Sequence, residues 1–77
     1  MKYYRVIKNG RTLRKPRTMR QIQHLAWDGH DITVVDVNNG TRFELVEVLS
    51  FGRLLFSRGD GSRLIYDGLD GSLRQVA

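Results

Sequence analysis

The sequence contains no cysteine, which excludes disulfide bonds, thiolate metal sites and a cysteine nucleophile. It has a single proline and no low-complexity run, so its composition does not favour disorder. No apolar run approaches the roughly 20 residues that span a bilayer, and the N-terminal residues lack the apolar stretch of a secretory signal. We therefore expect a cytoplasmic protein that does not contact membranes and is stabilised by packing alone.

The length of the chain allows one hydrophobic core. A domain of 77 residues is small, and folding at this size buries only about 60% of the surface of the unfolded chain. Hydrophobic residues make up 40% of the sequence and charged residues 27%, which is ordinary for a globular protein. We expect a single domain over residues 1–77.

Acidic residues are absent from the first 27 positions, which carry eight lysines and arginines. The rest of the chain has five arginines and eight carboxylates. Charge separated in this way produces a directional field, which favours a polyanionic partner such as nucleic acid or an acidic protein surface. A solvated basic face that only maintains solubility is the alternative.

The first elements are predicted to form a β-hairpin. Aromatic and β-branched residues occupy positions 3–7, and Asn9-Gly10 is a strong signal for a two-residue hairpin loop leading into a second strand over 11–14. The resulting register pairs Lys8 with Arg11, Ile7 with Thr12, Val6 with Leu13, and Arg5 with Arg14. Like charges directly opposed destabilise a sheet, so the last pair calls for an anion, either a phosphate or a carboxylate from elsewhere in the fold.

A short helix should follow over residues 19–27. Pro16 ends the strand, and the spacing of Thr18 and Gln21 matches a capping box, in which each side chain satisfies a free backbone amide of the other residue. The helical period places an apolar stripe on one side, made of Met19, Ile22, Leu25 and Ala26. Arg20, His24 and Trp27 fall on the opposite side, and Asp28-Gly29 is expected to end the helix.

The remaining residues predict a β-meander. Apolar stretches alternate with turn signals from residue 32 onward, which indicates about five strands. A ten-residue echo, in which Asp60-Gly61 recurs as Asp70-Gly71, is explained by successive hairpins of equal length. The predicted fold class is therefore α+β: an N-terminal β-hairpin, one short α-helix, and a β-meander that forms a small barrel-like or sandwich sheet.

The inventory for catalysis and metal binding is small. His24 and Asp28 have helical i, i+4 spacing, but an exposed pair of this kind is usually structural, and His30 belongs to a turn. The aspartate and glycine series after residue 59 lacks the order of a calcium loop and matches ordinary turns. We expect neither an enzyme nor a cofactor or metal site.

Basic residues interleaved with aromatic ones are the main functional signal, because cations bind phosphates and exposed aromatic rings stack on unpaired bases. The candidate contact residues are Arg5, Lys8, Arg11, Arg14, Lys15, Arg17, Arg20, His24 and Trp27. They favour a nucleic-acid-binding accessory or regulatory protein. The alternative is a phage-type or host-directed inhibitor or adaptor that docks on an acidic surface of a partner protein, and the oligomeric state stays open.

Residues 18–45 contain a helix, a glycine, an apolar strand and an Asp-x-x-x-Gly turn in that order, carried by Thr18, Met19, Ile22, Leu25, Gly29, Asp31, Ile32, Val34, Val35, Asp36 and Gly40. This third of the chain resembles the N-terminal DNA-binding segment of bacterial polyhydroxyalkanoate accumulation regulators. The resemblance implies a bacterial DNA-binding regulator with contacts among Lys8, Arg11 and Arg14. The chain departs from that family in lacking its basic stretch rich in tyrosine, proline and asparagine, and in having further hairpins after Phe51.

Overall fold

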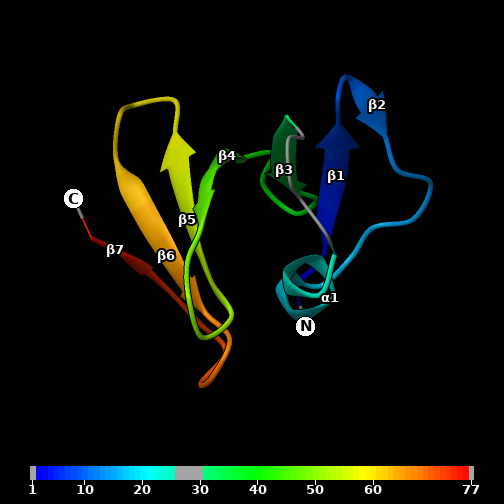
Figure 1. Ribbon diagram of the computed structural model, residues 1–77. Coiled ribbons are helices and arrows are strands. Elements are labelled where there is room, and N and C mark those ends of the chain that lie inside the picture. Colours follow the sequence, from blue (N-terminus) through cyan, green and yellow to red (C-terminus); the bar gives the residue numbers. More distant parts are fainter. Residues whose placement is uncertain (1, 26–30, 77) are drawn as a thin grey trace.

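The computed structural model describes residues 2–25 and 31–76, which form seven β-strands and one short helix (Figure 1). In chain order the elements are β1 (Tyr4–Lys8), β2 (Arg11–Thr12), α1 (Met19–Gln23), β3 (Ile32–Asp36), β4 (Arg42–Val48), β5 (Arg53–Arg58), β6 (Arg63–Asp67) and β7 (Ser72–Gln75). The predicted order of a hairpin, a short helix and five further strands is confirmed.

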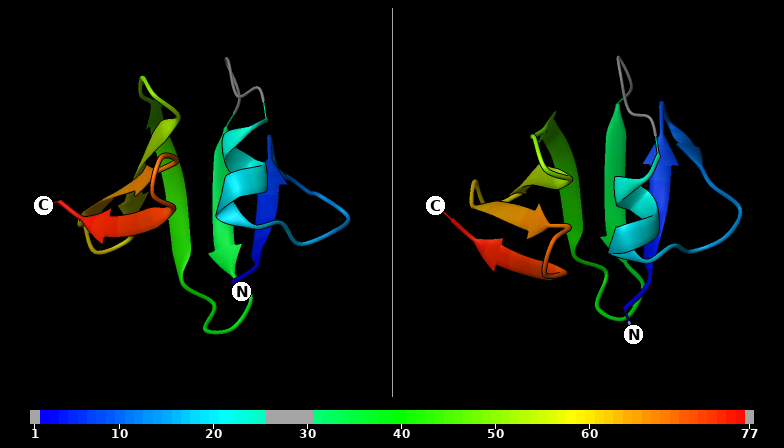
Figure 2. Two further views of the ribbon diagram at one scale, coloured as in Figure 1. Left: turned by 90° about the horizontal axis from the view of Figure 1, so that it is seen from below. Right: turned by 60° about the horizontal axis from the view of Figure 1, so that its bottom comes forward.

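All seven strands belong to one antiparallel sheet with the order β2-β1-β3-β4-β5-β6-β7. The sheet is open, with β2 and β7 at its two edges, so the expected closure into a barrel or sandwich is wrong. The sheet curls, and α1 lies over its hollow side between the β1 end and the β7 end (Figure 2). The helix α1, and not a pairing between the edge strands β2 and β7, therefore covers the hollow side of the sheet.

The predicted register of the first hairpin is confirmed for its two inner pairs, Ile7 with Thr12 and Lys8 with Arg11. Asn9 and Gly10 have φ angles of 51° and 81°, as a two-residue loop of type I′ requires. The second strand is shorter than expected, because β2 ends at Thr12 and not at residue 14. The chain leaves the sheet before Pro16, which has no amide hydrogen to donate, and it returns at an isolated bridge between Tyr4 and Arg17.

The start of α1 follows the predicted capping box. The Gln21 amide donates to Thr18 Oγ1 over 3.2 Å, and the Thr18 amide donates to Gln21 Oε1 over 2.9 Å. The helix ends at Gln23 and not at residue 27, because the His24 amide donates to the Gln21 carbonyl and so tightens the last turn. The stop expected at residues 28–29 lies outside the described residues.

The core lies between α1 and the hollow face of the sheet. Its buried apolar residues are Tyr4, Val6, Met19, Ile22, Ile32, Val34, Phe43, Leu54, Phe56, Leu64 and Tyr66. The Phe43 ring makes edge contacts with Tyr4 at 6.4 Å and with Phe56 at 6.3 Å between centroids, which joins the two halves of the sheet. A bulge at Val46, between Leu45 and Glu47, gives β4 an extra residue and bends the sheet around this core.

The ten-residue echo corresponds to two equivalent turns. The Asp60 carboxylate accepts the amide of Ser62 over 2.9 Å, and the Asp70 carboxylate accepts the amide of Ser72 over the same distance. In a tight turn, an Asp carboxylate typically accepts a hydrogen bond from the backbone amide two residues further along the chain. The repeat is therefore a feature of successive hairpins.

Candidate functional site

The structure divides the candidate contact residues into two groups. Six of them lie on β1, β2 and the loop over residues 13–17, and we call this group the basic edge; its members are Arg5, Lys8, Arg11, Arg14, Lys15 and Arg17. Arg20 and His24 are exposed on α1 and at its C-terminal cap. Trp27 lies outside the described residues.

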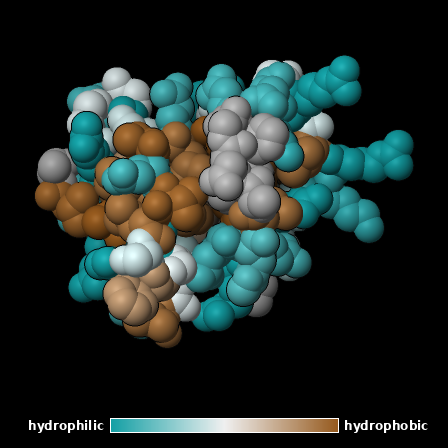
Figure 3. Space-filling view, viewed as in Figure 1, coloured by the Kyte–Doolittle hydropathy of each residue, from teal (hydrophilic) through white to brown (hydrophobic). Residues whose placement is uncertain are grey.

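The basic edge occupies the open side of β2 and the loop that follows it. Arg11, Arg14 and Lys15 are exposed, and hydrophilic side chains extend from this end of the molecule (Figure 3). The loop is held at both ends: Leu13 donates to the Val6 carbonyl over 2.7 Å, and Arg17 and Tyr4 exchange two backbone hydrogen bonds of 2.8 Å. The backbone of the loop is thus hydrogen-bonded to the sheet at both ends.

The charge of the basic edge is not neutralised within the described chain. Across residues 2–25 and 31–76 the ion pair that the structure shows is Lys2 Nζ to Asp36 Oδ2, at 3.8 Å, and it lies apart from the basic edge. Arg5 Nη1 instead donates to the Arg14 carbonyl over 3.3 Å. The sequence predicted an anion between Arg5 and Arg14. No carboxylate of the described residues occupies that position, and the Arg14 carbonyl accepts a hydrogen bond from Arg5 instead.

A hollow of about 270 Å³ lies between the loop and α1, lined by Lys15, Pro16, Arg17 and Gln21. Arg17 Nε is buried and has no hydrogen-bond partner among the described residues. A buried donor of a charged group without a partner destabilises the fold. Because this atom is not open to solvent, the positive charge that the hollow presents to a ligand comes from the exposed Lys15.

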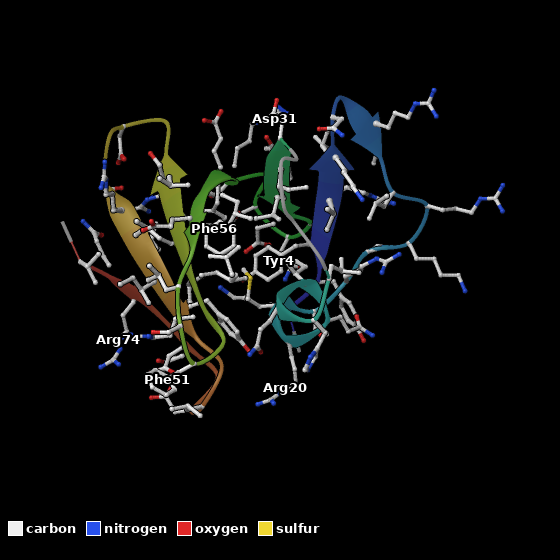
Figure 4. All side chains as sticks on the ribbon, in the orientation of Figure 1. Tyr4, Arg20, Asp31, Phe51, Phe56 and Arg74 are labelled. Carbon is white, nitrogen blue, oxygen red and sulfur yellow. The ribbon has the colours of Figure 1, made fainter. Side chains whose placement is uncertain are left out.

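On the other side of α1 a cleft of about 470 Å³ separates the helix from β6 and β7; its lining residues are Lys2, Tyr4, Thr18, Met19, Arg20, Tyr66, Gly71 and Leu73. Arg20 points away from the core on this side (Figure 4). The sequence grouped Arg20 with the basic edge, but the structure places it across the helix from that edge. The cations of the N-terminal segment therefore divide between the basic edge and the cleft side of α1 and do not form one compact patch.

Tyr4, which lines this cleft, is directly opposed to Asp36 in the pairing of β1 with β3. Burial raises the pKa of the Tyr4 phenol above 10.0, and the negative charge of Asp36 raises it further. Asp36 Oδ1 accepts the amide of Asn38 over 2.8 Å, which explains how a carboxylate with 3% exposure is accommodated. The pair has the arrangement of a structural contact at the start of a turn.

The structure offers limited material for other site chemistry. Within the described ranges, no three His, Asp or Glu side chains are grouped so that they would hold a metal ion. The partner proposed for His24, Asp28, lies outside those ranges, as does His30. In the same part of the chain no helix has the length and apolar character needed to cross a membrane.

The sequence reasoning missed Phe51. This side chain is 75% exposed at the turn between β4 and β5, with a φ of 60°. The signal was present in the sequence, because Phe51-Gly52 occupies a hairpin position where Asn-Gly is the usual choice. An exposed aromatic ring in that position is a candidate contact residue.

No protein-family model matches the chain, and comparisons with curated proteins and with solved structures find no match.

Proposed function

We propose that the protein is a small nucleic-acid-binding accessory or regulatory protein that holds the phosphate backbone with its basic edge. One observation carries this proposal: six lysines and arginines gather on one edge without a carboxylate partner among the described residues. A phosphate backbone supplies a regular row of negative charges, and its neutralisation releases counterions. The position of these cations on an edge strand and a projecting loop makes them accessible to an extended polyanion.

The contacts of the basic edge are expected to position the ligand without reading its sequence. Lysine and arginine side chains on an exposed loop reach phosphate oxygens readily, whereas base readout requires an element that enters a groove. The only helix in the described chain has five residues and packs two of them, Met19 and Ile22, into the core. We therefore assign it to support of the loop and not to groove recognition.

The test is a titration of labelled single-stranded and duplex oligonucleotides by fluorescence anisotropy at several salt concentrations. Replacement of Arg11 and Arg14 by Gln should weaken binding and lower the slope of log K against log salt by about two, one for each phosphate contact. The matched control replaces Arg42 and Arg63, which are equally exposed but lie outside the basic edge. It removes the same charge and should leave the slope within about 0.5 of its original value.

Two outcomes contradict the proposal. Equal losses in the two variants would mean that net charge alone attracts the ligand. Absence of binding to every oligonucleotide at low salt would favour the alternative from the sequence, an inhibitor or adaptor that docks on an acidic protein surface.

A further inference from the structure

Phe51 occupies a strained position in the turn between β4 and β5. Phe51 and Gly52 have φ angles of 60° and 69°, which match the 51° and 81° of Asn9 and Gly10 in the first hairpin. Asn tolerates this left-handed conformation because its side chain bonds locally, but a large aromatic residue adopts it only at a loss of stability.

The strain has no compensation in the contacts of the ring. Phe51 is 75% exposed. The aromatic ring contacts within the described residues involve Tyr4, Phe43 and Phe56 and do not include Phe51. Residues held in sparsely populated backbone regions concentrate at ligand contacts, where the strain serves binding. The observation therefore indicates a role for Phe51 outside the folded chain.

The surroundings of Phe51 are fixed by contacts between turns and carry charges of both signs, because Arg53 is directly opposed to Asp67 in the pairing of β5 with β6. The Gln23 carboxamide at the end of α1 fits against both Gly52 and Gly68, which brings the β4–β5 turn and the β6–β7 turn together beside the helix. Arg53 Nε donates to the Ser50 carbonyl over 3.2 Å, so its guanidinium is held beside the turn. Leu69, 79% exposed at the neighbouring turn, is aliphatic and offers no face on which a base could stack.

The helix α1 lies between these turns and the loop of the basic edge in each ribbon view (Figures 1 and 2). Arg20 projects from α1, and Phe51 lies on the same lower side of the molecule (Figure 4). The chain measures 27 × 26 × 26 Å, so a ligand that reaches from the basic edge to Phe51 crosses one molecular width. A segment of about four nucleotides or slightly more suits such a site.

We propose that Phe51 stacks on an unpaired base, and that the ligand is a single strand running from the basic edge past Arg20 to this turn. The inference rests on the proposed function and adds a preference for unpaired nucleic acid. Aromatic stacking is tolerant of sequence and needs a free base face, which duplex DNA does not offer within its stack. The phosphates on either side of the stacked base would lie near Arg20 and Arg53.

The experiment compares three variants on an oligothymidine strand of about ten nucleotides and on a duplex of equal length. Phe51→Asn removes the ring and suits the turn, Phe51→Trp keeps a stacking ring, and Leu69→Asn removes an equally exposed side chain that has no aromatic face. We expect Phe51→Asn to weaken single-strand binding by roughly fivefold to a hundredfold. Duplex binding should be unaltered, while the other two variants should bind the single strand as the original protein does.

Each other outcome separates the inference from the proposed function. If Phe51→Asn binds the single strand normally while the Arg11/Arg14→Gln variant loses binding, the stacking role is wrong and the phosphate role stands. Equal losses in Phe51→Asn and Leu69→Asn would show an apolar docking surface and overturn stacking. Absence of binding to either polymer would remove the proposed function, and the inference with it.

Discussion

Tyr4 and Asp36 are directly opposed in the pairing of β1 with β3, and both side chains are buried, at 4% and 3% exposure. Burial first, and the charge of Asp36 second, raise the pKa of the Tyr4 phenol in the folded state. The folded protein therefore favours the neutral phenol more strongly than the unfolded chain does.

This relationship predicts a loss of stability in alkali. The contribution of Tyr4 is fully present below the unfolded pKa of about 10.0 and is lost as the pH rises from there through the raised folded value. Thermal unfolding followed by circular dichroism between pH 8 and 11 should show a steeper decline for the original protein than for Tyr4→Phe. The two proteins share every other titrating group. Parallel curves would therefore mean that ionisation of the Tyr4 phenol does not destabilise the folded protein.

The Gln23 carboxamide predicts that a side chain at Gly68 displaces Gln23. A Cβ at Gly68 would overlap this carboxamide, although the backbone there does not require glycine. Because the end of the Gln23 side chain can move aside, we expect Gly68→Ala to lower the free energy of unfolding by no more than about 1 kcal/mol. In urea unfolding, the Gly68→Ala and Gln23→Ala double variant should lose less than the sum of the single losses, and additive losses would contradict a direct contact.

The capping box makes α1 sensitive to Thr18. Thr18→Ala removes the acceptor of the Gln21 amide and should lower the free energy of unfolding by about 1 kcal/mol. For a chain of this size that corresponds to a decrease in Tm of about 4–8 °C. Thr18→Ser keeps the hydroxyl and should stay close to the original Tm, so equal losses in both variants would assign the effect to the methyl group.

Phe51→Asn should stabilise the protein. Asn adopts the left-handed conformation of the turn with less strain, and the exposed ring contributes little burial, so we expect a gain of about 1 kcal/mol in calorimetry. A lower Tm for this variant would show that the ring supports the fold, and the strain would then need no external ligand to explain it.

Local chemistry determined what the sequence predicted well. Asn9-Gly10 defined both the loop and the register of the first hairpin, and the spacing of Thr18 and Gln21 defined the start of α1. Long-range pairing was not readable, because alternation tells which face a residue occupies but not which strand lies beside it. The neighbourhood of β1 and β3, the bulge at Val46 and the open sheet all depend on such pairing.

The candidate site was predicted in part for the same reason. The six cations from Arg5 to Arg17 lie together on the basic edge, because they belong to one hairpin and its loop, whereas Lys2 pairs with Asp36. Arg20 was assigned to the same face, yet the helix turns it toward the other side. Phe51 was overlooked, since its conformation is visible only once the turn is built.

The pairing of β1 with β3 has a consequence for how such a chain folds and diversifies. Every other neighbouring pair in the sheet joins consecutive strands, so β3 to β7 form from local contacts with short loop closures. The segment between β1 and β3 interrupts this sequence of consecutive pairings, and it carries β2, most of the basic edge and α1. We therefore infer that the meander pairs early in folding, and that this segment completes the core later through Met19 and Ile22 of α1.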